Sequence, residues 1–196
     1  EHKAIIFNGN GYSDEWLEEA ARRGLPNLVS TVDALPHYMD PQNIAMFEKF
    51  HVYTKEEIAS RTDILLENYS KVINIEAMTM LDMTKKKLLP AAMEYGKKIC
   101  DTAIAKKQLG LDASAETKLA SDLDSNTAKM YEAMQALESK VNAAKEIGDV
   151  LECAKAYRSQ VFSAMSDLRT YADQLEMLVS AEDWPLPPYS DLLFNV

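Results

Sequence analysis

Residues 123–144 read LDSNTAKMYEAMQALESKVNAA, and the spacing of apolar and small residues in this stretch decides the fold. These residues recur at alternating intervals of four and three positions, which is the heptad pattern of a helix that packs against another helix. The positions of this first seam are Leu123, Thr127, Met130, Met134, Leu137, Val141 and Ala144. The pattern predicts one long α-helix with a single buried face.

A second seam with the same spacing follows Gly148, a residue suited to the bend between two helices. Its positions are Val150, Ala154, Tyr157, Val161, Ala164, Leu168, Tyr171, Leu175 and Leu178. The two seams predict a pair of long antiparallel helices. Because such a pair alone would leave too much apolar surface exposed, we expect the helices of residues 54–109 to be the third and fourth partners of a bundle.

Residues 54–109 carry a helical pattern with little interruption. The pattern begins with Thr54-Lys55-Glu56-Glu57, a capping box, and Gly110 provides the stop. Pro90 lacks a backbone donor and clashes with the preceding turn, so a kink or a break is expected between Leu88 and Pro90. Both outcomes stay open, and with them the number of helices in the bundle.

The two ends of the chain offer the only strand-like runs. Ala4 to Phe7 is a short apolar run closed by the turn residues Asn8-Gly9-Asn10-Gly11, and Leu192 to Val196 is a second possible strand. Either the two strands pair, or the partner sheet has been removed, since the chain opens with Glu1 like a piece cut from something longer. The predicted fold class is mainly α, a helical bundle with long antiparallel helices plus one or two short strands near the termini.

Three further segments complete the predicted fold. Ser13 caps a helix that stops at Gly24, and Asp40-Pro41 begins a short amphipathic helix with Ile44, Phe47 and Phe50 on one face. The segment Trp184 to Tyr189 is rich in proline and is therefore expected to be extended, with its apolar residues docked on the bundle.

Composition and charge narrow the function classes. The 196 residues are 47% hydrophobic and 27% charged, with a formal net charge of −10 that would repel a phosphate backbone, so general nucleic-acid binding is excluded. No apolar run approaches the length of a membrane span and no signal peptide is evident, which favours a cytoplasmic setting without a membrane partner. Cys100 and Cys153 lie in helical patterns and are expected to fill small spaces in the core.

The polar residues form no recognisable active site. His2, His37 and His51 have no second ligand at metal-binding spacing, and the Asn-Gly turn lacks the residues that follow a phosphate-binding loop. Asp122, Asp124 and Asn126 resemble the start of a calcium loop, but Thr127 and Ala133 stand where glycine and glutamate are required. The lysine clusters, at 85–87, 97–98 and 106–107, are expected on a solvated face. We therefore assign no catalytic, cofactor-binding or metal-binding residue.

Several stretches nevertheless resemble the C-terminal portion of type III glutamine synthetases, in the glutamate–ammonia ligase family. They are IIFNGNGYSDEW at 5–16, RGL at 23–25, NIEAMTM at 74–80, DLR at 167–169, DQLE at 173–176 and WPLPPYSDLLF at 184–194. STVDAL at 30–35 and VYTKEEI at 52–58 are similar to the last helices of the catalytic domain in ordinary glutamine synthetases. The likeness covers nearly the whole chain in order.

The resemblance implies that residues 1–73 are the end of a catalytic domain and that residues 74–196 are a type III-specific helical bundle with a docked proline-rich tail. It implies a cytoplasmic, double-ring homo-oligomer that joins ammonia to glutamate through γ-glutamyl phosphate, using ATP with Mg²⁺ or Mn²⁺. The family's catalytic motifs have no counterpart here, so this chain is expected to serve structure and assembly, in contact with its own catalytic domain and neighbouring subunits. The alternative is a free-standing helical-bundle module for protein interaction.

Overall fold

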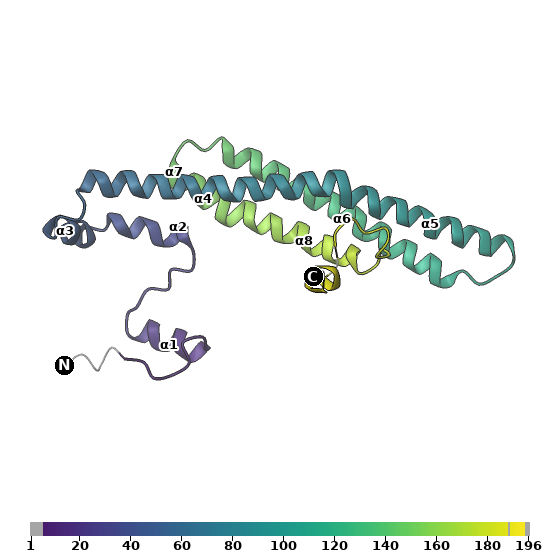
Figure 1. Cartoon of the computed structure of the whole chain (residues 1–196), viewed down its shortest axis with the longest axis horizontal. Coiled ribbons are helices and arrows are strands. Elements are labelled where there is room, and N and C mark those ends of the chain that lie inside the picture. Colours follow the sequence, from purple (N-terminus) through teal and green to yellow (C-terminus); the bar gives the residue numbers. More distant parts are fainter. Residues whose placement is uncertain (1–5, 188, 195–196) are drawn as a thin grey trace. The chain divides into compact units, whose positions relative to one another are not determined.

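A computed structural model describes residues 6–187 and 189–194, and the described part of the chain is almost entirely helical (Figure 1). The fold is mainly α, as the sequence predicts. Two compact units divide the chain within one helix, the first spanning Glu1–Leu65 and the second Leu66–Val196. Each unit is built from its own local contacts.

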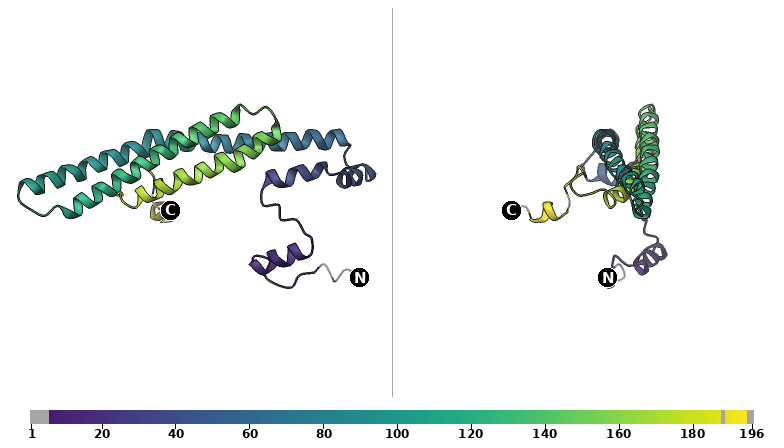
Figure 2. Two further views of the ribbon diagram at one scale, coloured as in Figure 1. Left: turned by 180° about the vertical axis from the view of Figure 1, so that it is seen from behind. Right: turned by 90° about the vertical axis from the view of Figure 1, so that its right-hand side faces the viewer.

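The second unit is a bundle of long helical segments that run side by side in alternating directions (Figures 1 and 2). The first of them is unbroken over 54 residues and begins in the first unit. Its parts are α4 (Lys55–Met83), a π-helical turn (Thr84–Leu88) and α5 (Leu89–Gln108). The bundle continues with α6 (Ser114–Lys145), α7 (Val150–Ala156), a second π-helical turn (Tyr157–Val161) and α8 (Phe162–Glu176), and α9 (Tyr189–Phe194) follows in the tail.

Both predicted seams form the core of the bundle. Leu137 and Met130 of the first seam are fully buried, as are Val161 and Leu168 of the second. Across from them, the long first helix contributes the apolar residues Ile73, Ala77, Leu81, Leu88, Leu89 and Ala92 to the same cluster. The region expected to supply a third and a fourth partner is therefore a single continuous helix.

Pro90 neither breaks nor ends this helix. Just before Pro90 the helix widens into the π-helical turn, in which the N–H of Leu89 donates to the carbonyl of Thr84, five residues earlier. A wider turn is a known way to accommodate a missing backbone donor within a helix. A second π-helical turn joins α7 to α8, where the N–H of Phe162 donates to the carbonyl of Tyr157, although no proline lies there.

The helix ends follow the predicted local signals. The N–H of Thr54 donates to Glu57 Oε2 at 2.8 Å and the N–H of Glu57 to Thr54 Oγ1 at 3.3 Å, so both hydrogen bonds of the capping box are present. Gly110 has a φ of +71°, the left-handed conformation that glycine adopts without strain after a helix. Between α6 and α7, the Asp149 side chain caps α7 by accepting from the N–H of Glu152 at 2.9 Å.

The first unit consists of short helices joined by loops. It contains α1 (Asp14–Arg22), α2 (Thr31–Ala34), a 3-10 helix (Leu35–Met39), α3 (Pro41–Lys49) and the beginning of α4. Ser13 and Asp40 occupy the predicted N-cap positions, and Gly24 follows α1 with a φ of +73°. Its buried apolar residues are few, with Val32, Leu35 and Ile58 the members below a tenth exposed.

The prediction of short strands near the termini is wrong for the described residues. Ala4, Ile5 and Val196 lie outside the described residues, Ile6 and Phe7 have no regular secondary structure, and residues 192–194 belong to α9. The described residues contain no strand at all. An isolated strand leaves its N–H and C=O groups unpaired, whereas a helix pairs them within one segment, so the helix is the better state for an apolar end without a partner sheet.

The tail docks on the bundle through Trp184, which is 8% exposed, and Leu186 packs against the same core. Lys98 Nζ lies 2.5 Å from Asp183 Oδ1, which ties the tail to α5. Cys153 is half-buried against the core, but Cys100 is exposed, contrary to its predicted place in the core. The buried side of α5 passes through Ala103, and Cys100 lies to one side of it.

Candidate functional site

The titratable residues singled out in the sequence do not converge on a site. Within residues 6–187 and 189–194, no three His, Cys, Asp or Glu side chains gather where they could hold a metal ion. His37 Nδ1 lies 2.8 Å from Asp40 Oδ2, and Asn126 Nδ2 donates to the Asp122 carbonyl at 3.0 Å within α6. The described residues therefore bring no metal-ligand set together, and His2 lies outside the described residues.

The turn at Asn8-Gly9-Asn10-Gly11 uses its polar groups within itself. Asn10 Oδ1 accepts from the N–H of Tyr12 at 3.0 Å, and the Asn10 carbonyl accepts from the N–H of Ser13 at 3.2 Å and from Ser13 Oγ at 2.9 Å. Gly9 lies against the Phe7 ring, where a Cβ atom would come within 2.4 Å of it. These contacts explain the turn as a connector into α1.

An ionic and aromatic cluster fixes this connector to α1. The rings of Phe7 and Trp16 lie with centroids 4.5 Å apart, and the Arg23 guanidinium lies 6.0 Å from each centroid. Glu19 accepts hydrogen bonds from Arg22 and Arg23, and these two contacts lower the pKa of Glu19 to about 2. The cluster holds residues 7–23 together without a catalytic arrangement.

Each of the three lysine clusters has at least one member that pairs with an acid on the surface of the bundle. Lys85 Nζ lies 2.7 Å from Glu138 Oε1 on α6, and Lys86 pairs with Asp82 one turn away. Near the other end of α5, Lys106 pairs with Glu116, and this contact is the main cause of the lowered pKa of Glu116. These pairs agree with the predicted solvated face.

A cavity of the first unit is lined by apolar and aromatic side chains. It has a volume of about 290 Å³ and is lined by Tyr38, Phe47, Tyr53, Ile58, Arg61, Thr62, Ile64 and Leu65. The Phe47 ring lies between Tyr38, at a centroid distance of 6.3 Å, and Tyr53, at 5.8 Å. The Arg61 guanidinium stacks 4.5 Å from the Tyr53 centroid, a cation–π contact. We did not predict this cavity, because it forms where the start of α4 meets side chains of the 3-10 helix, of α3 and of the loop before α4, and these elements share no common period.

Large apolar side chains are widely exposed in the first unit. More than half of the surface of Val29, Phe50 and Ile64 is accessible, at 70%, 66% and 61%. Other exposed members are Ile6, Leu17, Leu25, Leu28, Met46, Val52 and Leu65. Soluble proteins seldom leave so many apolar side chains of a small unit uncovered unless the surface meets a partner. The candidate functional feature of this unit is thus an interaction surface that includes the aromatic cavity.

The helices of the described residues include no candidate membrane-spanning segment.

Comparison with known proteins identifies similar sequences over the full chain. Residues 1–107 match the family described as glutamine synthetase C-terminal domain. A glutamine synthetase of Butyrivibrio fibrisolvens is 41% identical over 197 residues, covering 100% of this chain and 28% of that protein. The type-3 glutamine synthetase of Dictyostelium discoideum is 31% identical over 99% of this chain and 27% of its own length. A glutamine synthetase of Bacteroides fragilis (strain YCH46) is 31% identical over 97% of this chain and 27% of its own length.

The chain thus spans little more than a quarter of the length of the curated relatives that it matches. These matches confirm the resemblance that the quoted sequence motifs predict.

Proposed function

Because this chain belongs to the glutamine synthetase family, which it matches through the C-terminal domain, we propose that it is the C-terminal portion of a type III glutamine synthetase. The parent enzyme joins ammonia to glutamate through γ-glutamyl phosphate, with ATP and Mg²⁺ or Mn²⁺ bound elsewhere in the polypeptide. The cytoplasm is its proposed location. Our proposal gives this chain no catalytic residue of its own.

The proposed role of the chain is structural, in packing and in oligomer assembly. The observation that carries this role is the exposed apolar surface of the first unit, with Val29, Phe50 and Ile64 each more than half accessible. The second unit differs, because it buries both heptad seams in a core of its own. We propose that the apolar surface packs against the catalytic domain of the same polypeptide or against a neighbouring subunit of a double-ring homo-oligomer.

The proposed function also assigns a separate structural role to each of two parts of the chain. Residues 1–73 are proposed to complete the catalytic domain and residues 74–196 to form the type III-specific helical extension. The two compact units of the fold divide after Leu65, and the family match extends to residue 107. Neither of these limits tests a domain boundary at residue 73, which stays a prediction.

The experiment that tests this proposal uses the full-length polypeptide. An antibody raised against residues 66–187 should detect, in the source cells, a species several times heavier than this chain, and that species should form glutamine from glutamate, ammonia and ATP. A species of 22.0 kDa without a heavier form would overturn the proposal and favour a free-standing interaction module.

The role in assembly is tested by charge placed in the apolar surface. In the full-length enzyme, Phe50→Asp is expected to lower the sedimentation coefficient by releasing subunits, or to expose the first unit to proteolysis. Gln42→Asp is the matched control, since Gln42 is also exposed in the α3 region but polar. Equal sedimentation and equal protease resistance of wild type and Phe50→Asp would exclude this surface from assembly.

A further inference from the structure

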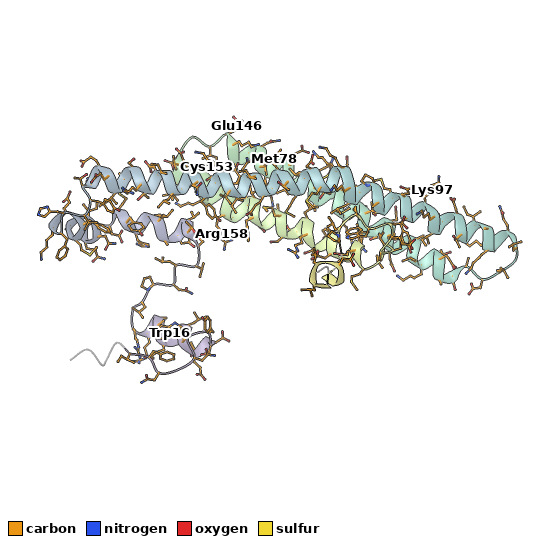
Figure 3. The ribbon with its side chains drawn as sticks, viewed as in Figure 1. Trp16, Met78, Lys97, Glu146, Cys153 and Arg158 are labelled. Atoms are coloured by element: carbon orange, nitrogen blue, oxygen red, sulfur yellow. The ribbon has the colours of Figure 1, made fainter. Side chains whose placement is uncertain are left out.

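A second cleft lies in the bundle, where α4 passes the loop that joins α6 to α7. Its volume is about 310 Å³, within the range of small-molecule sites in proteins. Cys153 lies at this end of the bundle (Figure 3) and lines the cleft together with residues of α4 and of the loop. All of its lining residues belong to the second unit.

The floor of the cleft is polar, buried and held in place. Tyr157 is 3% exposed and Ser70 is 8% exposed, yet both line the cleft. The Tyr157 hydroxyl donates to Asn74 Oδ1 at 3.2 Å, which leaves Asn74 Nδ2 without an acceptor among the described residues. Ser70 Oγ donates to the Leu66 carbonyl at 3.1 Å. The floor therefore offers an amide donor beside two hydroxyl oxygens that can still accept hydrogen bonds.

The rim of the cleft adds positive charge. Lys145 has no carboxylate partner among the described residues, and its Nζ donates to the Met78 sulfur at 4.0 Å. Lys71 Nζ lies 2.9 Å from Glu67 Oε2, so the two lysines and one carboxylate sum to a single positive charge. The side chains of Ile147 and Val150 give the cleft an apolar wall. This positive charge contrasts with the net charge of −10 of the whole chain.

We propose that this cleft binds a small organic carboxylate that also carries a hydroxyl group. The carboxylate contacts Lys145 Nζ, which has no carboxylate partner among the described residues, and Asn74 Nδ2. The ligand hydroxyl donates to the oxygen of Tyr157, and the carbon chain packs on Ile147. The site lies outside the surface proposed for assembly and does not rest on that proposal.

Other ligand classes match these groups less well. A cation would face the positive charge of Lys145, and the carboxylate of Glu67 is already shared with Lys71. Inorganic phosphate could bind the lysines, but it has no carbon chain to pack on the apolar wall of Ile147 and Val150. A hydroxy-carboxylate uses the rim, the floor and the wall together.

The test is equilibrium dialysis of the full-length protein against radiolabelled L-malate, with succinate and inorganic phosphate as competitors at constant ionic strength. Lys145→Met and Tyr157→Phe are each expected to weaken malate binding by about tenfold, the effect of one hydrogen bond to a charged or fixed polar group. Lys107→Met is the matched control, because it removes the same charge from an exposed site elsewhere on α5 and should leave binding unchanged. Circular dichroism checks that each variant is folded.

Alkylation of the two cysteines gives an independent readout with an internal control. Malate should slow the reaction of Cys153 with a maleimide and leave Cys100 unaffected, because Cys100 lines a different groove. The proposal is overturned if malate shows no saturable binding, if Lys107→Met weakens binding as much as Lys145→Met, or if Cys100 and Cys153 are protected alike. Succinate or phosphate competing as well as malate would overturn the assignment to a hydroxy-carboxylate.

Discussion

The hydroxyl of Tyr157 donates a hydrogen bond to Oδ1 of Asn74 across 3.2 Å, and this contact links the π-helical turn between α7 and α8 to α4. Tyr157 belongs to the second heptad seam, and its ring lies in the core while its hydroxyl reaches the cleft. Burial raises the pKa of this hydroxyl, and the nearby Cys153 raises it further. Tyr157 therefore stays a neutral donor at physiological pH.

Tyr157→Phe is expected to lower the free energy of unfolding by about 1 kcal/mol, since it removes one hydrogen bond and keeps the buried ring. Chemical denaturation followed by circular dichroism measures the change. Tyr131→Phe serves as the control, because Tyr131 is 46% exposed on α6 and should tolerate the change within about 0.5 kcal/mol. Equal effects of the two substitutions would mean that the contact with Asn74 adds nothing to stability.

The first heptad seam predicts a larger effect at its centre. Leu137 is 0% exposed, so Leu137→Ala leaves a cavity in the core and should cost about 2–5 kcal/mol of unfolding free energy. Gln135→Ala, on the exposed side of the same helix, should change stability by less than about 0.5 kcal/mol. Urea denaturation distinguishes the two, and a Leu137→Ala variant as stable as wild type would contradict the predicted core.

The periodic part of the sequence predicted most of the bundle. Leu137 and Val161 follow a strict spacing, and a helix with one apolar face must bury that face, so pattern and core agree. The π-helical turn at Tyr157–Val161 escaped prediction because no proline or glycine lies there. Tertiary packing rather than local preference sets such a turn.

The candidate sites were less accessible to sequence reasoning. The cleft brings together Asn74, Lys145 and Tyr157, which lie in three separate segments of the chain. No motif of neighbouring residues in the sequence predicts that they lie close together. The exposed apolar surface of the first unit likewise could not be predicted, because the spacing of its apolar residues along the sequence does not show which of them the fold leaves uncovered. Family resemblance, carried by short stretches such as residues 74–80, supplied the functional hypothesis that the residue chemistry lacked.

The ion pair between Lys98 and Asp183 predicts that docking of the tail depends on pH. The hydrogen bond from Lys98, followed by that from Ser180, lowers the pKa of Asp183 below its ordinary value of 3.8. A carboxyl with a lower pKa in the folded state stabilises that state above the unfolded pKa, and this stabilisation is lost as the pH falls through the folded pKa. The tail should therefore loosen in acid, below a pH of about 3.8.

Comparison of wild type with Asp183→Asn isolates this effect from other carboxyl groups. The difference in unfolding midpoint should be constant near neutral pH, should begin to shrink as the pH falls below the unfolded pKa of Asp183, and should vanish once the pH has passed below the lower, folded pKa. Lys98→Met should give the same pH dependence as Asp183→Asn. A difference that persists unchanged at the lowest pH would show that Lys98 does not act through the charge of Asp183.

Trp184 anchors the tail by burial alone, and this makes a sharp prediction about its indole nitrogen. The side chain is 8% exposed, and its Nε1 atom is buried without a hydrogen-bond acceptor among the described residues. Trp184→Ala removes the buried ring and should cost about 3–5 kcal/mol of the free energy that holds the tail and bundle together. Trp184→Phe keeps an aromatic ring and removes an unsatisfied donor, whose burial costs about 1–3 kcal/mol, so the loss of area is largely offset. Chemical denaturation should place the phenylalanine variant within about 1 kcal/mol of wild type. If Trp184→Phe were as damaging as Trp184→Ala, the indole N–H would have to be hydrogen-bonded in the folded protein.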